Sequence, residues 1–177
     1  MADIVSPEKR SRMMAGIRGK NTKPEIIVRK LLHAAGFRFR LHRKNLPGKP
    51  DIVLPKYRVA IFVNGCFWHG HENCDLFRLP KSNTEFWEAK IAGNVERDRK
   101  KQAGLLDEGW RVLVIWECAL KGKLKLDNSV LTEMMLGFIK YGQEAKEEIA
   151  SRAECNKSCA YTPQVECYRH KLNYAGM

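Results

Sequence analysis

Hydrophobic residues recur at helical spacing between residues 22 and 35, which predicts an amphipathic helix there. Thr22 is a suitable N-cap, and Gly36 suits the position just past the C-terminal end. The next residues, 37–42, alternate strictly between hydrophobic and polar side chains, which predicts a half-exposed strand. The apolar face of the helix is expected to comprise Ile26, Ile27, Leu31, Leu32, Ala34 and Ala35.

The rest of the pattern adds three strands and two helices. Strands are predicted at 51–54, 58–63 and 110–116, where β-forming residues cluster. Helices are predicted at 84–106, after the capping-box match 82–85, and at 128–141. The order helix, three strands, helix, strand, helix predicts a mixed α/β layer fold. On the longer helix the expected buried side is Phe86, Trp87, Ile91, Val95, Leu105 and Leu106, and residues 97–101 are expected to be solvated.

Three regions follow from this pattern. Residues 1–22 form a basic N-terminal arm, 23–142 the folded core, and 143–177 a Cys-containing tail that we expect to be flexible. Within that tail, 144–152 has the composition of a charged helix. No hydrophobic run is long enough to cross a membrane, and the N-terminus lacks the apolar stretch of a signal peptide, so we expect a cytoplasmic protein.

The positive charge is concentrated at the N-terminal end. Residues 1–50 carry 13 Lys and Arg against three acids, whereas 51–177 carry 19 against 17. A nearly neutral body with a basic leading segment is typical of proteins that bind polyanions. A general effect on solubility is the alternative, but segregation of the charge favours nucleic acid and a nucleoid-associated location.

Six cysteines in a chain without a signal peptide favour metal sites or free thiols over disulfides. Cys66, His71 and Cys74 are close enough in sequence to share a Zn²⁺ ion, which prefers four nitrogen and sulfur ligands. Cys118 is the expected fourth ligand because it follows a strand that should lie beside the one leading to Cys66; a small buried hydrophobic residue is the alternative. The remaining candidates for a second zinc, or unpaired thiols, are Cys155, Cys159, Cys167 and His170.

Asp51 follows a turn at the start of a predicted strand, where an Asp is often only a turn residue. Glu25 near a helix start and His69 in the loop after the adjacent strand suggest more. A carboxylate at this place can hold Mg²⁺ against a phosphate, and His69 can act as a general base near neutral pH. A zinc ligand, or a neighbour of the zinc site, is the alternative role of His69.

Phe67 and Trp68 are adjacent in the metal-rich loop. Such a pair either closes a hydrophobic core or contacts something outside the protein, and the pattern alone leaves both open.

Six motifs in a fixed order resemble the very short patch repair (Vsr) mismatch endonucleases over roughly residues 8–140. The resemblance implies a fold similar to type II restriction endonucleases, in which helices flank a mixed sheet, together with a structural zinc site. The motifs are Leu46-Pro47-Gly48-Lys49-Pro50-Asp51, Gly65-Cys66-Phe67-Trp68-His69, Thr84-Glu85-Phe86-Trp87, Asn94-Val95-Glu96-Arg97-Asp98, Gly109-Trp110-Arg111-Val112 and Trp116-Glu117-Cys118.

The implied activity is Mg²⁺-dependent nicking of double-stranded DNA at a T:G mismatch, on the 5′ side of the mispaired T. Such mismatches arise when 5-methylcytosine deaminates, so a DNA cytosine methyltransferase and mismatch-repair proteins are the implied functional partners. A nickase needs one active site per duplex, which favours a monomer.

The resemblance also implies roles for individual residues. By position, Asp51 is similar to the metal-binding aspartate, His69 to the catalytic histidine and Glu25 to an acidic residue near that centre. The Val63 backbone is similar to a second Mg²⁺ contact. The zinc ligands correspond to Cys66, His71, Cys74 and Cys118, with one extra residue between His71 and Cys74. The DNA-wedging residues correspond to Met14, Phe67, Trp68 and Trp87.

Val63-Asn64 departs from the Thr-His pair found in some family members. A metal contact through a backbone carbonyl tolerates any side chain at 63, but Asn64 cannot exchange protons as an imidazole does, which leaves that work to His69. Two other functions therefore stay open: a mismatch-binding protein that has lost turnover, and a related nuclease with altered sequence specificity.

Overall fold

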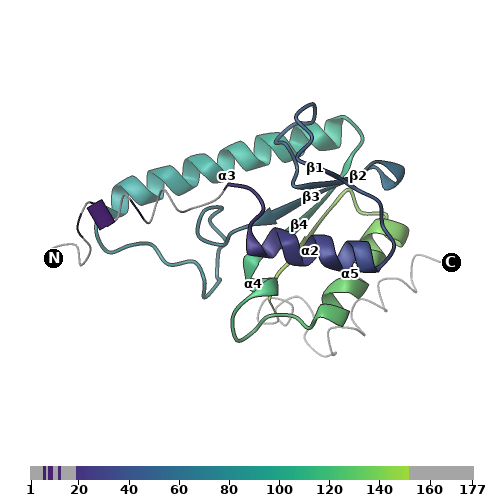
Figure 1. Cartoon of the computed structure of the whole chain (residues 1–177). Coiled ribbons are helices and arrows are strands. Elements are labelled where there is room, and N and C mark those ends of the chain that lie inside the picture. The colour runs from purple at the N-terminus through teal and green to yellow at the C-terminus, as the bar shows by residue number, and fades with distance from the viewer. Residues whose placement is uncertain (1–5, 7, 10–11, 13–18, 152–177) are drawn as a thin grey trace.

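The computed structural model describes residues 6, 8, 9, 12 and 19–151. A five-stranded sheet in the order β1-β2-β3-β4-β5 forms its centre (Figure 1). The first three strands are antiparallel, and β3, β4 and β5 are parallel, so the sheet is mixed as predicted. The strands are β1 (Arg40–Leu41), β2 (Ile52–Leu54), β3 (Val59–Asn64), β4 (Arg111–Trp116) and β5 (Lys146–Ile149).

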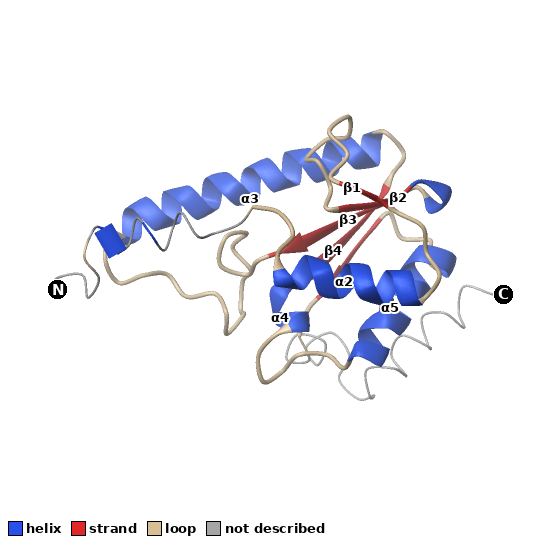
Figure 2. Ribbon diagram, in the orientation of Figure 1, coloured by secondary structure: helices blue, strands red, loops and turns tan. Residues whose placement is uncertain are grey.

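Helices cover both faces of the sheet (Figure 2). The long helix α3 packs on one face through its C-terminal part, and its N-terminal part extends beyond the sheet (Figure 1). α2 and α5 pack on the other face, and α4 follows β4 directly. No helix in the described part of the chain is long and apolar enough to cross a bilayer. The helices are α2 (Lys23–Ala34), α3 (Thr84–Asp107), α4 (Glu117–Leu120) and α5 (Asn128–Tyr141), with a short 3₁₀ helix at Pro55–Tyr57.

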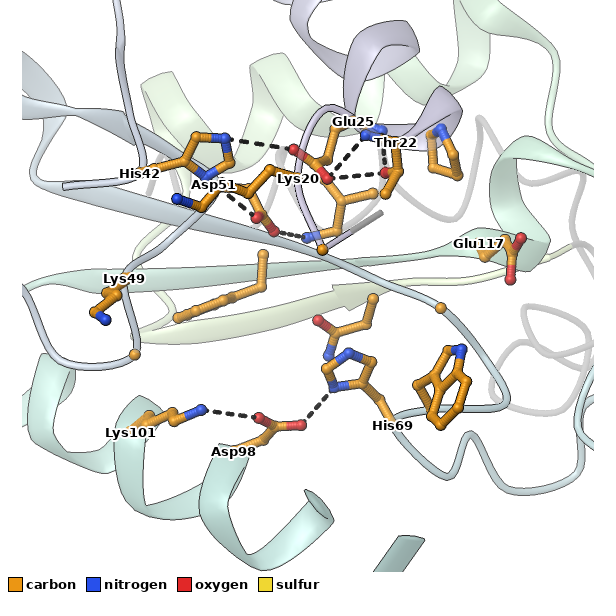
Figure 3. Close-up of a pocket in the computed structure, with 18 of the residues that line it drawn as sticks. Lys20, Thr22, Glu25, His42, Lys49, Asp51, His69, Asp98, Lys101 and Glu117 are labelled. Carbon is orange, nitrogen blue, oxygen red and sulfur yellow. Dashed lines mark hydrogen bonds and ion pairs between the residues drawn. The ribbon is translucent and has the colours of Figure 1, made fainter. Parts of the chain in front are cut away.

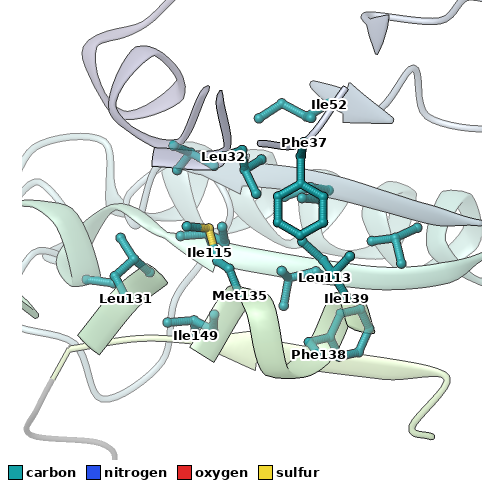
Figure 4. Close-up of a cluster of buried hydrophobic side chains, with 14 of the residues drawn as sticks. Leu32, Phe37, Ile52, Leu113, Ile115, Leu131, Met135, Phe138, Ile139 and Ile149 are labelled. Atoms are coloured by element: carbon teal, nitrogen blue, oxygen red, sulfur yellow. The ribbon is translucent and has the colours of Figure 1, made fainter. Parts of the chain in front are cut away.

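The alternation of side chains along each strand divides the core into two layers. Along β4, Leu113 and Ile115 join the layer below α2 and α5, whereas Val112 and Val114 join the layer below α3. Figure 4 shows the first layer, in which Phe138 of α5 and other large side chains are fully buried. Because β3 and β4 are buried on both faces, they form a rigid base for the loops at their C-terminal ends.

Four local expectations are wrong. Residues 146–149 form β5 rather than part of a charged helix, because their backbone pairs with β4. Only two residues of the 37–42 segment pair as a strand. α3 begins after Asn83, which has a left-handed backbone (φ 53°) and makes no side-chain cap, so the predicted capping box is absent. Phe86 and Ile26 are 61% and 39% exposed rather than buried.

Candidate active site and metal centre

A cavity of about 890 Å³ lies where the C-terminal end of β3 meets the first turn of α2 and the middle of α3. It brings together the three predicted catalytic residues, Glu25, Asp51 and His69, from segments far apart in the sequence (Figure 3). The predicted site residues Val63, Phe67 and Trp68 also line it. Glu25, His42 and Asp51 lie along one side, and His69, Asp98 and Lys101 along the other. A group bound between the two sides is therefore in reach of carboxylates, imidazoles and an ammonium.

Asp51 is held by β3, because its Oδ2 accepts a hydrogen bond from the Val63 backbone N–H at 2.9 Å. Burial raises the pKa of Asp51 to about 6 against the opposing effect of this hydrogen bond, and the nearby charge of Glu25 raises it further. A carboxylate whose charged form is disfavoured in this way gains from a neighbouring cation. Asp51 and the backbone of Val63, which are the two groups expected to contact Mg²⁺, therefore lie side by side.

Glu25 is only 3% exposed and is fixed from several directions. It forms a reciprocal capping box with Thr22 at the start of α2, and Arg29 one turn later donates to its Oε2. This places a carboxylate in the first helical turn, where the helix dipole favours negative charge. Glu25 is therefore a rigid, hydrogen-bonded wall of the cavity.

His42 completes this side of the cavity and was absent from the predicted site. Its Nε2 lies 3.7 Å from Glu25 Oε2, and its Nδ1 lies 3.8 Å from Asp51 Oδ1. The three side chains offer ligand atoms within 4.8 Å of one another. Burial lowers the pKa of His42, which favours the neutral ring. The sequence could have indicated His42 through the pairing of the predicted strands 37–42 and 51–54, which brings it beside Asp51. In the structure the His42 backbone N–H donates to the Asp51 carbonyl.

His69 faces Asp98 on the opposite side, with Nδ1 and Oδ2 2.5 Å apart. A proton on Nδ1, donated to Asp98, leaves Nε2 as the basic atom. The expectation that Asp98 is fully solvated is wrong, because its side chain is 22% exposed and lines the cavity. Helical spacing could have indicated Asp98, because residues 94 and 98 lie on the same face of a helix. In the structure Asn94 donates to the carbonyl of Trp68 at 2.8 Å, so this face of α3 contacts the loop that carries His69.

The predicted metal-binding cluster assembles from residues on both sides of His69 in the same loop and from the start of α4. Cys66, His71, Cys74 and Cys118 bring one nitrogen and three sulfur ligand atoms within 4.8 Å of one another. Cys118 arrives at the start of α4 because β4 runs parallel to β3, which was the reason for expecting it there. His69 is not a member of this cluster. The donor set and its size fit tetrahedral Zn²⁺.

The thiols of the cluster differ in pKa. The hydrogen bond between Cys66 and Cys118 lowers the pKa of Cys118 and raises that of Cys66, and His71 lowers the pKa of Cys118 further. Burial raises the pKa of Cys74. His71 also stacks on Trp116, with ring centroids 3.9 Å apart, and the indole N–H donates to Glu148 of β5. These contacts orient the imidazole from outside the cluster.

Between the cavity and the protruding end of α3 lies a cluster of aromatic rings. Phe67 contacts Trp68 and Trp87 edge to face, at centroid distances of 5.1 and 5.4 Å, and Trp68 lies 6.0 Å from Trp87. All three side chains are partly exposed. Phe77 and the exposed Phe86 extend this cluster and were not predicted to belong to it. The rings support one another and remain accessible from outside.

Asn64 is 6% exposed, at the last position of β3 on the cavity wall. The residue that departs from the family pattern therefore faces the same space as Asp51 and His69. Met14 and the four tail candidates, Cys155, Cys159, Cys167 and His170, lie outside the described residues.

Comparison with known proteins gives consistent matches. Residues 2–75 match the sequence profile of the DNA mismatch endonuclease Vsr family. The chain is 45% identical over 149 residues to DNA mismatch endonuclease Vsr of Escherichia coli, covering 84% of this chain and 94% of that protein. It is 56% identical over 120 residues to type II nicking enzyme V.XorIIP of Xanthomonas oryzae, covering 68% of this chain and 88% of the relative.

A further relative is type II nicking enzyme V.NmeAIP of Neisseria meningitidis, 51% identical over 123 residues that cover 70% of this chain and 87% of the relative. The matches extend over most of the chain and nearly all of each relative. Together with the mixed sheet, they establish that this chain belongs to the Vsr family of DNA mismatch endonucleases.

Proposed function

We propose that this protein is an endonuclease that nicks double-stranded DNA at T:G mismatches, on the 5′ side of the mispaired T. The observation that carries the proposal is the cavity of about 890 Å³, in which a half-buried carboxylate, Asp51, lies opposite an imidazole, His69, that is paired with Asp98. Relatives named as a mismatch endonuclease and as nicking enzymes support the same reaction class.

In this proposal Asp51 and the backbone carbonyl of Val63 hold Mg²⁺, and Glu25 and His42 border the same site. The raised pKa of Asp51 supports this role, because a bound cation offsets the cost of its charge. When bound, the ion supplies positive charge next to the phosphate and lowers the pKa of bound water. Cys66, His71, Cys74 and Cys118 hold Zn²⁺, which ties the loop to the end of β4.

His69 acts as the general base. Its Nδ1 is oriented by Asp98, so that Nε2 takes a proton from water as the water oxygen bonds to phosphorus. The bond from phosphorus to the leaving sugar oxygen breaks, and that oxygen takes up a proton from solvent water. Asn64 has no basic ring nitrogen, so His69, in the loop after β3, is the imidazole at this end of the strand that can take the proton. The Asp98 carboxylate stabilises the imidazolium that forms.

The aromatic cluster detects the mismatch. Phe67, Trp68 and Trp87 enter the base stack from one side, and Met14 enters from the minor groove. Unstacking a step costs a few kcal/mol and less at a mispair, so wedging favours mispaired DNA. Trp87 belongs to the N-terminal part of α3, which extends beyond the sheet (Figure 1), and Phe67 and Trp68 pack against it from the loop after β3. A methyltransferase that makes 5-methylcytosine is the expected functional companion, and one chain per mismatch is expected.

A nicking assay with end-labelled duplexes tests the proposal. Mg²⁺, wild-type protein and a T:G duplex should give one cut 5′ of the mispaired T, whereas matched C:G DNA should stay intact. Asp51→Ala should bind the mismatch duplex and cut more than about 1,000-fold more slowly. Retained cutting by Asp51→Ala would remove Asp51 from the centre.

The same assay separates two other candidate functions, both motivated by Asn64 in the cavity wall. Binding without cutting would indicate a mismatch-binding protein, and Asn64→His would then be expected to gain activity. Cutting of matched DNA would indicate a nuclease with altered sequence specificity.

A further inference from the structure

We infer that Lys101 of α3 is a catalytic residue, whose ammonium contacts the non-bridging oxygens of the scissile phosphodiester from the side opposite Asp51. The inference rests on the proposed nuclease function. Neither the motifs of the sequence nor the residue roles they imply include Lys101. It follows from the position of the side chain in the cavity.

The first observation is the contact of Lys101 with Asp98, the carboxylate that pairs with His69. Lys101 Nζ lies 3.8 Å from Asp98 Oδ1, and the other oxygen of Asp98 faces His69. Figure 3 shows Asp98 between Lys101 and His69 along one wall, across the cavity from Asp51. The Lys101 ammonium therefore contacts the carboxylate that pairs with His69, the proposed general base.

The second observation is the packing of the Lys101 stem. A Cβ built on Gly48 would lie 2.9 Å from Lys101 Cβ and 3.1 Å from its Cδ, so the turn that leads to Asp51 rests directly on this side chain. The stem is therefore confined between α3 and the turn. Confinement reduces the entropy that a free surface lysine loses when its ammonium is fixed.

The third observation is the charge of the two walls. Glu25, Asp51, Asp98 and Glu117 all line the cavity, and a phosphodiester adds another negative charge. Arg29 lies beside Glu25 on the Asp51 side. The lysines that line the cavity are Lys20, Lys44, Lys49, Lys101 and Lys121. Of these, Lys101 contacts Asp98 at 3.8 Å, whereas Lys121 pairs with Glu117 at 2.7 Å.

An ordinary helix-surface ion pair is the competing explanation, and α3 contains one for comparison. Lys100 pairs with Glu96 at 3.4 Å, with side chains 76% and 56% exposed. The Lys101–Asp98 side chains are 43% and 22% exposed and line the cavity. The neighbouring residue Lys100, of the same type and on the same helix, is therefore a matched control.

The test is single-turnover nicking of the T:G duplex at saturating protein, together with duplex affinity measured by fluorescence anisotropy. Lys101→Met should slow cutting at least about 10-fold, because removing one donor to the developing charge costs about 100- to 1,000-fold in a water-excluded site and Lys101 is 43% exposed. Its dissociation constant should rise less than about three-fold, since one phosphate contact among many is lost. Lys101→Arg should restore most of the rate, and Lys100→Met should match wild type.

A second readout measures the contact without cleavage. Without added Mg²⁺ and with the zinc retained, a duplex with a neutral methylphosphonate at the scissile position should bind wild type about three-fold more weakly than the unmodified duplex, and this difference should disappear in Lys101→Met. The assignment would be overturned if the two duplexes differed in affinity by the same factor for wild type and Lys101→Met. It would also be overturned if Lys101→Met cut the T:G duplex as fast as wild type, or if Lys100→Met lost as much of the cutting rate as Lys101→Met. Wild-type protein that cuts no duplex would instead contradict the proposed function, and the role of Lys101 with it.

Discussion

At the scale of single residues, the site is built from side chains held in costly surroundings. Asp51 is the strongest case, because burial raises its pKa more than the Val63 hydrogen bond and the nearby Arg29 and His69 lower it. The type and position of Asp51 were readable from the sequence. The raised pKa of Asp51 could not be predicted from the sequence, because it depends on burial by α2 and the loop after β3.

Asp51→Asn should stabilise the metal-free protein at pH 7.5 and have no effect on stability near pH 4. The folded-state pKa, about 6, exceeds the ordinary value of 3.8, so the folded state loses stability as pH rises through this interval. The Asp51→Asn substitution removes this loss of stability, and its amide oxygen can still accept the hydrogen bond from the Val63 N–H. The full shift corresponds to about 3 kcal/mol, and partial exposure reduces the expected gain to about 1–2 kcal/mol.

Thermal unfolding in EDTA at the two pH values measures this difference. The exposed residue Asp107 provides the control, since Asp107→Asn should change the midpoint little at either pH. A destabilised Asp51→Asn at pH 7.5, or an equal shift at both pH values, would contradict the burial argument.

At the scale of elements, the strands and helices had clear signals, and the contacts between them did not. The bounds of α5 agree with the prediction, whereas β5 was missed because Lys146–Ile149 is mostly polar on one face and gains its pairing from β4. Arg111, known from the sequence only as part of a motif, ties β4 to α5. Its guanidinium donates to the carbonyls of Phe138, Ile139 and Gly142 at the end of that helix.

Arg111→Met should reduce the free energy of unfolding by about 2–4 kcal/mol, because it leaves several helix-terminal carbonyls without donors. It also removes the guanidinium from the ring of Phe138, 5.0 Å from its centroid. Urea unfolding measures the loss. Arg99→Met, an exposed arginine on α3, should stay within about 0.5 kcal/mol of wild type. Similar stability of both variants would show that Arg111 does not secure α5.

At the scale of the whole molecule, the Cys/His cluster joins the loop that carries His69 to the end of β4. Removing the metal should therefore loosen the aromatic rings and the general base together. Cys118→Ser should lose its zinc and lower the thermal midpoint by about 10 °C, since a loss of about 3–5 kcal/mol shifts the midpoint by about 2–4 °C per kcal/mol in a chain of this size.

Metal analysis of the purified wild type should give one zinc per chain. After chelation, Zn²⁺ should restore the midpoint and Mg²⁺ should not, which separates the two metal sites. An unchanged midpoint and zinc content in Cys118→Ser would show that this residue is not a ligand.

The sequence by itself determined the mixed α/β class, most element positions and the family, because those depend on local spacing of hydrophobic residues and on ordered motifs. It also indicated Asp51, His69 and the cysteine–histidine set, whose chemistry is carried by residue type. Only the tertiary structure shows that His42, Asp98 and Lys101 line the same cavity as Asp51 and His69. They come from separate segments, and no local pattern encodes which segments the parallel pairing of β3 with β4 and the packing of α3 bring together.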